Sequence, residues 1–174
     1  SLAAIEQVVF IEKTVTLSQL CDALKHNFVG YEDLQNRLLQ VPKYGNNHDL
    51  PDKYAVWFVE LHNRLFSAYQ TPDGGPIYIA IAANISNIPA GAEIAATPDG
   101  RRCGEPLSDA ASPMHGQDIS GPTAVVLSVT KPDYQLAACG TVINQKYSFD
   151  MFREPSKRAK LAALIRTYFQ RGGQ

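Results

Sequence analysis

The side chains best suited to binding or catalysis lie in one stretch, from Ala96 to Ala124. It reads ATPDGRRCGEPLSDAASPMHGQDISGPTA. Two adjacent guanidinium groups, Arg101 and Arg102, can bind an anionic substrate through forked hydrogen bonds. Carboxylates, hydroxyls and one imidazole surround them. The candidate residues of the stretch are Asp99, Arg101, Arg102, Ser108, Asp109, Ser112 and His115.

Proline and glycine recur every few residues here, and each breaks a helix or strand. Long loops without secondary structure are usually functional or disordered. Apolar, strand-like residues flank this one and no low-complexity bias appears, so we expect an ordered loop. Such a loop must satisfy its own polar groups. We therefore predict that Ser108, Asp109 and Ser112 cap backbone groups, and that at least one arginine pairs with Asp99, Glu105 or Asp109.

Other acid, base and nucleophile combinations have less support. His115 is the most obvious catalytic histidine, and with Ser112 or Ser128 it could serve a hydrolase, but no G-x-S-x-G elbow is present. His48 and Asp49 could form an acid/base pair. A solvated helix entry, with Asp49 near the positive end of a helix, is the stronger interpretation. We assign no catalytic residue within the chain.

A second set of candidates follows the segment IYIAIAANISNI, residues 77–88, which we predict to be a strand. The segment is β-branched and aromatic at first and then abruptly polar, at Asn84, Ser86 and Asn87. A strand of this kind commonly delivers side chains to a site. The alternative, that these groups satisfy neighbouring backbone, is equally open from the residues alone.

The composition describes an ordinary globular protein: 174 residues, 45% apolar and 19% charged. A net charge of −1 argues against nucleic acid or an anionic membrane as a main partner. No apolar run approaches the roughly 20 residues that span a bilayer, and the amino end lacks the features of a signal peptide. Cys21, Cys103 and Cys139 have no metal-type spacing, so we predict no metal site and a reduced, cytoplasmic setting. Cys21 belongs to an apolar helical stripe and should be buried.

The predicted elements make the chain an α/β protein, mainly helices around a few strands. Residues 1–70 should be helical, with a capping box at Thr16 and Gln19. A strand and the long loop occupy residues 77–124. A helix from Pro122, a strand over residues 139–147 and an amphipathic helix from Pro155 make up residues 121–171. We treat residues 1–174 as one segment of a catalytic domain.

The long loop resembles the segment T-P-D-G-R-[RK]-x-G-x-P-L-[AS]-D-x-x-S-P-x-x-G-x-D-x-x-G-P-T-A of the glycyl radical enzymes, the pyruvate formate-lyase-like family. NFVGYEDLQNRLLQVPKYGN upstream, and GTVINQKYS and LIRTYFQRGGQ downstream, are also similar to that family. The resemblance implies a fragment of a ten-stranded α/β barrel that encloses the radical site. It implies that the strand bearing Asn84, Ser86 and Asn87 lines the substrate cavity. Many members replace His115, which implies a structural role for it.

The reactions implied by the resemblance are those of radical lyases, dehydratases and formate C-acetyltransferase-like transferases. The amino-acid sequence of the loop is more similar to the dehydratase and lyase branches. The whole enzyme would carry a glycyl radical, installed by an S-adenosylmethionine-dependent activating enzyme. This segment itself would bind no cofactor. Implied partners are the remainder of the enzyme chain, the activating enzyme, a small-molecule substrate and a second copy in a homodimer, with no nucleic acid and no membrane.

Two family motifs do not occur: the segment with the thiyl-forming cysteine and the radical glycine motif R-V-x-G-[YF]. Cys139 lies on the wrong side of the loop to be that cysteine. We expect the chain to stop where the glycine domain would begin, and to be inactive alone. Enzymatic activity is expected of the parent family and not of this chain alone. The alternatives are a non-catalytic structural fragment and one subunit of a split enzyme that needs a partner chain.

Overall fold

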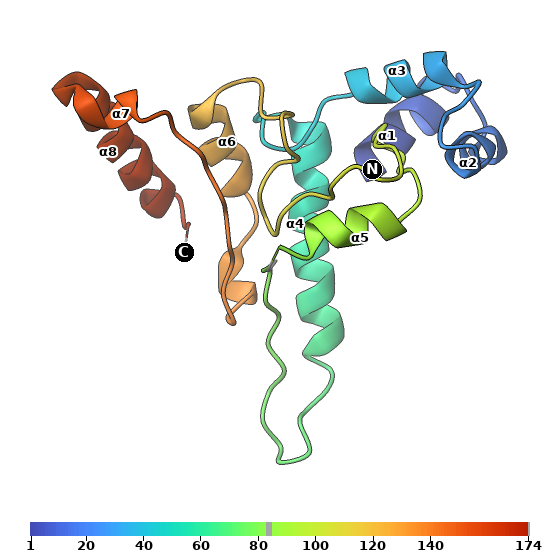
Figure 1. The fold of residues 1–174 in the computed structure, drawn as a ribbon. Helices are drawn as coiled ribbons and strands as arrows, with labels where there is room; N and C mark the ends of the chain where they lie inside the picture. Colours follow the sequence, from blue (N-terminus) through green and yellow to red (C-terminus); the bar gives the residue numbers. More distant parts are fainter. Residues whose placement is uncertain (83–84, 174) are drawn as a thin grey trace. The chain divides into compact units, whose positions relative to one another are not determined.

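The computed structural model describes residues 1–82 and 85–173, which form two compact units (Figure 1). The first unit consists of residues 1–43 and 85–107, and the second of residues 44–82 and 108–173.

The first unit is helical. Its elements are α1 (Leu2–Ile5), the π-helical η1 (Glu6–Ile11), α2 (Leu17–Lys25), α3 (Glu32–Gln40) and α5 (Asn87–Glu93). The predicted capping box is present: the Gln19 amide donates to Thr16 Oγ1 at 3.2 Å, and the Thr16 amide donates to Gln19 Oε1 at 2.8 Å. Val8, Leu20 and Phe28 are fully buried. Cys21 is exposed, so its predicted place in the core is wrong.

The second unit is built on α4 (Asp49–Phe66), with α6 (Pro122–Val129), the 3₁₀-helix η2 (Tyr134–Leu136), α7 (Asp150–Arg153) and α8 (Pro155–Gln170). Helix α8 contacts α6, and η2 contacts α4. Pro122 is the first residue of α6 and Pro155 the first residue of α8, so both helices start where the sequence indicates. The core of the unit includes Val59, Val125, Val129 and Leu161.

The two predicted strands are extended segments rather than β-strands in the described part of the chain. They run parallel: Cys139 N–H donates to Ile79 O at 3.2 Å, Ile81 N–H to Gly140 O at 3.0 Å and Val142 N–H to Ile81 O at 2.9 Å. Ile81 and Thr141 form one parallel bridge. A strand needs a longer ladder with neighbours, which two short segments do not supply.

The predicted strand over residues 77–88 also ends too late, because Asn87 and Ile88 belong to α5. The asparagine, serine and proline around them favour a turn and a helix start over continued pairing. The described residues therefore form a helical structure with two extended segments, and the few-strand part of the fold prediction is not confirmed.

Candidate functional site

The predicted cavity residues lie at the start of α5, in the first unit. Asn84 lies outside the described residues. Ser86 is exposed, and its carbonyl accepts a hydrogen bond from Ala90 N–H at 3.0 Å. Asn87 is half-buried: its side chain donates to Leu107 O at 3.2 Å, and its carbonyl accepts from Leu107 N–H at 3.0 Å. The Asn87 side chain is therefore engaged with the backbone at the end of the long loop, and contact with substrate stays a prediction for all three residues.

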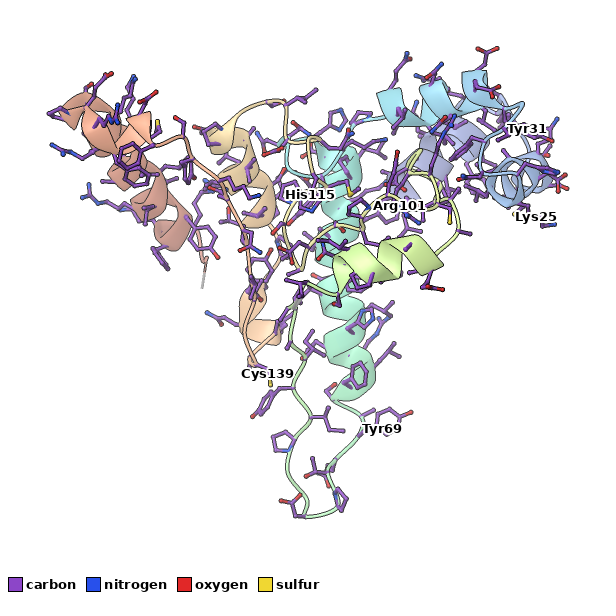
Figure 2. The ribbon with its side chains drawn as sticks, viewed as in Figure 1. Lys25, Tyr31, Tyr69, Arg101, His115 and Cys139 are labelled. Carbon is purple, nitrogen blue, oxygen red and sulfur yellow. The ribbon has the colours of Figure 1, made fainter. Side chains whose placement is uncertain are left out.

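Arg101 is the centre of the loop in the first unit (Figure 2). Its side chain is only 4% exposed, yet every nitrogen of the guanidinium group has an acceptor. Nε donates to Thr97 Oγ1 at 3.2 Å, and the terminal nitrogens donate to the carbonyls of Gly91, Ile94, Ala95, Arg102 and Glu105. The expected carboxylate partner is thus replaced by carbonyl oxygens for Arg101.

The identity of these carbonyls explains why an arginine fits there. Gly91 lies in the last turns of α5, and Ile94 and Ala95 follow directly after it. The last four carbonyls of a helix have no partner within the helix, and they form the negative end of its dipole. A buried cation with five donors satisfies one of these four carbonyls, that of Gly91, together with the Ile94 and Ala95 carbonyls that follow the helix. Arg101 consequently joins α5 to the loop that follows it.

Arg102 and Gln35 connect the loop to α3. Arg102 donates from Nε and from a terminal nitrogen to Gln35 Oε1, at 3.1 and 2.8 Å. The Gln35 amide in turn donates to Gly100 O at 2.9 Å. Gly100 has a φ of 96°, and a Cβ atom there would lie 2.7 Å from Leu39 Cγ. Glycine is therefore required both by the backbone conformation and by the close approach to α3.

Asp99 completes the turn before Arg101. Its carboxylate accepts a hydrogen bond from Ser1 Oγ at 3.1 Å. Burial raises the pKa of the Asp99 carboxyl group, and hydrogen bonds from Thr97 and Ser1 lower it.

The second unit contains the rest of the loop, which is fixed to residues 142–144. Ser112 is 7% exposed, and its Oγ accepts a hydrogen bond from Asn144 N–H at 2.8 Å. The Asn144 side chain donates to the Asp109 carboxylate, and Ala111 N–H donates to Val142 O at 3.1 Å. Asp109 and Ser112 therefore hold the same asparagine, through its side chain and its backbone.

The sequence prediction did not include Asn144. Its only signal is the change from the apolar pair Val142–Ile143 to polar residues. The remaining loop candidates, Ser108 and His115, are exposed.

A buried polar cluster on α4 and α6 was also missed. Asp52 is fully buried, and both its carboxylate oxygens lie 3.0 Å from Ser128 Oγ, which donates to them. Ser128 Oγ accepts from Asn47 N–H at 2.7 Å, and Lys131 Nζ lies 2.7 Å from Asp52 Oδ2. The sequence does carry a signal, since Asp52 and the buried Val59 are seven residues apart, on one face of α4.

Two tyrosines lie beside this cluster. Burial raises the pKa of Tyr134 to about 12. Burial also raises the pKa of Tyr44 well above its ordinary value, and the neighbouring Tyr134 and Asp52 raise it further. Within the described residues the Tyr134 hydroxyl has no partner in hydrogen-bond geometry, although Tyr44 is close enough to influence its ionisation. Both hydroxyls therefore stay protonated at neutral pH.

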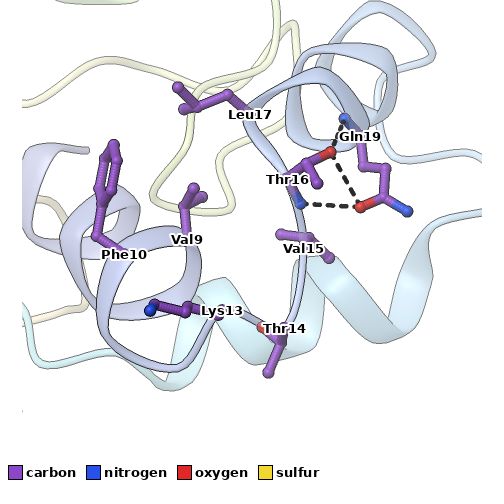
Figure 3. Close-up of a pocket in the computed structure, with 8 residues that line it drawn as sticks. All are labelled: Val9, Phe10, Lys13, Thr14, Val15, Thr16, Leu17 and Gln19. Carbon is purple, nitrogen blue, oxygen red and sulfur yellow. Dashed lines mark hydrogen bonds between the residues drawn. The ribbon is translucent and has the colours of Figure 1, made fainter.

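Two pockets are formed within single units. One, of about 400 Å³, lies where η1 meets α2 and is lined by Val9, Phe10, Lys13, Thr14, Val15, Thr16, Leu17 and Gln19 (Figure 3). The other, of about 320 Å³, lies between α4 and residues 77–81 and is lined mainly by apolar side chains. Neither contains a predicted site residue. Across residues 1–82 and 85–173 there is no group of three or more His, Cys, Asp or Glu placed to hold a metal ion.

None of the helices in the described ranges is both long and apolar enough to cross a membrane. Chemically, the polar groups of the loop are mostly occupied by internal partners. The arrangement is suited to holding backbone in place. Side chains that bind a substrate would have to come from residues outside these contacts.

Two family models match the chain, in sequence order. The model described as pyruvate formate lyase-like matches residues 1–91, and the model described as glycine radical matches residues 107–174. The second match corrects the expectation that the glycine domain would begin only where the chain stops. The loop after Leu107 already belongs to it, although the radical glycine motif itself is not within these residues.

Among curated relatives, a probable dehydratase, YbiW, of Escherichia coli strain K12 is 38% identical over 98% of this chain, and the match covers 22% of its own length. An isethionate sulfite-lyase of Bilophila wadsworthia is also 38% identical, over 97% of this chain and 20% of its own. The chain thus spans about a fifth of the length of these relatives.

Solved structures give the same result. The chain aligns with the B12-independent glycerol dehydratase of Clostridium butyricum, in its glycerol-bound form, with a TM-score of 0.95 and 37% identity, over 99% of this chain and 22% of that one. The hydroxyproline dehydratase of Clostridioides difficile aligns with a TM-score of 0.94 and 32% identity, again over 99% of this chain and 22% of the other. Identities of 37% and 32% show that the likeness is one of sequence as well as of fold.

Proposed function

Because the chain belongs to the pyruvate formate lyase-like family of glycyl radical enzymes, we propose that residues 1–174 are part of the catalytic body of a radical dehydratase or lyase. The observation that carries the proposal is the ordered pair of family matches, which together span nearly the whole chain. The named relatives are dehydratases and a lyase, which supports these branches over a formate acetyltransferase. The substrate is a small molecule.

In the whole protein, residues 79–81 and 139–142 are two neighbouring parallel strands of the ten-stranded α/β barrel. Their parallel hydrogen bonds support this placement. So do exposed large apolar side chains of the same unit: Trp57, Phe58 and Tyr78 are 45%, 48% and 58% exposed. Such exposure is expected where neighbouring parts of a protein are missing. A closed barrel would keep water and stray reactants away from a radical intermediate.

The residues divide into two roles. Asn84, Ser86 and Asn87 line the substrate cavity. Asp99, Arg101, Arg102, Ser108, Asp109, Ser112 and His115 hold the loop. The saturation of Arg101 by carbonyls and the double hold on Asn144 support the second assignment. A displaced loop would shift the cavity wall, and small displacements of reacting groups are costly to catalysis.

The radical glycine and the thiyl-forming cysteine lie outside residues 1–174 in this proposal. An activating enzyme that uses S-adenosylmethionine installs the radical, and the whole enzyme is a cytoplasmic homodimer. Residues 1–174 alone are then inactive, because a hydrogen-atom relay needs both groups. The alternatives are a structural fragment without catalysis and one subunit of a split enzyme.

The test uses the whole native protein and residues 1–174, each incubated anaerobically with the activating enzyme, S-adenosylmethionine and a panel of glycerol, 1,2-propanediol, isethionate and 4-hydroxyproline. We expect turnover of one substrate by the whole protein and none by residues 1–174. Turnover restored by mixing residues 1–174 with a separate chain would favour the split enzyme. No turnover of any related diol, hydroxy acid or sulfonate by the whole protein would contradict the proposal.

A further inference from the structure

The end of the chain has a charge distribution unlike the rest. Residues 150–174 contain six basic and two acidic residues, a net charge of +4, whereas residues 1–149 contain ten basic and fifteen acidic residues, a net charge of −5. The basic residues are concentrated where α7 meets α8. We call Arg153, Lys157, Arg158 and Lys160 the α8 basic patch.

Local contacts within α7 and α8 involve three of the four cations of this patch. Arg153 Nη1 lies 4.0 Å from Asp150 Oδ1, and Lys157 Nζ lies 2.9 Å from Glu154 Oε1, both between exposed or half-exposed side chains. Arg158 donates to Phe152 O at 3.3 Å, which brings its guanidinium group back toward α7. The two acidic residues therefore pair with two of the four cations, and Arg158 and Lys160 have no carboxylate among these contacts.

The position of the patch is unfavourable for the helix itself. Lys157, Arg158 and Lys160 lie in the first two turns of α8, at the positive end of the helix dipole. No acidic residue lies in the first turn, and the side chain of the N-cap residue Glu154 makes no capping bond. Departures from such helix preferences are expected at functional sites.

The surroundings of the patch fit a protein partner. Phe149 and Phe152 are 69% and 49% exposed, and Arg153 lies over the Phe149 ring at 4.8 Å from its centroid. Hot spots of protein interfaces are enriched in aromatic side chains and arginine. Duplex nucleic acid fits less well, because it would meet a small patch on a chain whose other residues are net negative.

From these observations we propose that the α8 basic patch, with Phe149 and Phe152, is a docking surface for a partner protein that presents an acidic segment with apolar side chains. The cations attract and orient the acidic groups, and the two phenylalanines supply apolar contact. The proposal does not depend on the reaction that the whole protein catalyses.

The test measures binding of a fluorescein-labelled peptide of alternating glutamate and leucine to the whole native protein by fluorescence anisotropy. The double variant R158E/K160E reverses two patch charges. The matched control, K25E/K146E, reverses two exposed lysines elsewhere. We expect the patch variant to weaken binding about tenfold or more, because like charges are then juxtaposed, and the control to change it less than about threefold. Phe152→Ala should also weaken binding, and added salt should weaken it for the unaltered protein.

Several results would overturn the proposal. One is equal weakening by the control variant. Others are equal binding of a peptide with glutamine in place of glutamate, or absence of binding to the whole protein, which would mean that its own remaining residues cover the patch. Tighter binding to duplex DNA or to phosphatidylglycerol vesicles than to the peptide would assign the surface to those partners instead. Circular dichroism spectra of all variants establish that they are folded.

Discussion

Replacing Asp52 with alanine removes the carboxylate that joins α4 to α6 in the second unit. The side chain is fully buried, it is the acceptor for Ser128 Oγ at 3.0 Å, and it pairs with Lys131 Nζ at 2.7 Å. Breaking a buried ion pair by removing one partner costs about 3–5 kcal/mol. Lys131 keeps 27% of its side chain exposed and can turn to water, which places the cost at the lower end of that range.

The second contribution comes from Ser128. Its hydroxyl is fully buried and would lose the group to which it donates, and an unpaired buried polar group costs about 1–3 kcal/mol. The two losses share one site, so they do not add fully. We expect Asp52→Ala to lower the free energy of unfolding by about 3 kcal/mol, or the melting temperature by roughly 6–12 °C for a domain of this size. Asp52→Asn retains an acceptor for Ser128 and should cost less.

Asp49 provides the matched control. It pairs with the same Lys131 Nζ at 3.1 Å, but its side chain is fully exposed. Exposed pairs contribute about 0–1 kcal/mol, so Asp49→Asn should change stability by no more than that. The assay is urea unfolding followed by circular dichroism, with melting temperatures as a second measure. Equal effects of Asp49→Asn and Asp52→Ala, or a loss below about 0.5 kcal/mol for Asp52→Ala, would refute the reasoning.

Three further predictions follow from the loop and the tyrosines. Arg101→Lys should lower the melting temperature by several degrees, because one ammonium group cannot reach all the carbonyls that accept from the guanidinium group. An unchanged melting temperature would show that these hydrogen bonds contribute little to stability. Asp109→Ala should chiefly lower folded yield or melting temperature in the whole protein, whereas Ser86→Ala should chiefly alter turnover, and the reverse pattern would exchange their assigned roles. The pKa of Tyr134 is raised to about 12 in the folded protein, against an ordinary 10.0, so the hydroxyl loses its proton at a lower pH in the unfolded state than in the folded state. The stability associated with this group is therefore full below pH 10 and is lost as the pH rises from 10 to 12. Tyr134→Phe should therefore reduce the loss of stability over that pH range, as measured by urea unfolding at each pH, and an identical pH profile would contradict the assignment.

The features that sequence reasoning predicted well are local ones. The capping box at Thr16 and Gln19 depends on residues three apart, and the start of α6 depends on the adjacent Gly121 and Pro122. In each case the preference is set by backbone chemistry within one turn. Such features need no knowledge of distant partners.

The features that were missed depend on partners far along the chain. Arg102 meets Gln35 across 67 positions, and Asp52 meets Ser128 across 76. Nothing in the local sequence specifies either pairing. Arg101 illustrates a different limit. The sequence predicts a structural role for an arginine here, but the carboxylates nearby in sequence suggested the wrong class of partner. Its acceptors are carbonyls at the end of α5, and they could not be identified before that helix was located.

The few-strand part of the fold prediction was not confirmed for a related reason. Apolar β-branched residues at 77–82 do specify extended backbone, and the segment does pair in parallel with residues 139–142. A sheet, however, is a property of several segments together. Our proposal places the remaining neighbours outside residues 1–174.

The central claim is that these residues belong to an enzyme that works through a glycyl radical, and electron paramagnetic resonance tests it most directly. The whole native protein and residues 1–174 are each treated anaerobically with the activating enzyme and S-adenosylmethionine, and their spectra are recorded. The account predicts a glycyl-type doublet from the whole protein and no protein radical signal from residues 1–174. A silent whole protein under conditions that activate a known family member, or a doublet from residues 1–174 alone, would contradict it.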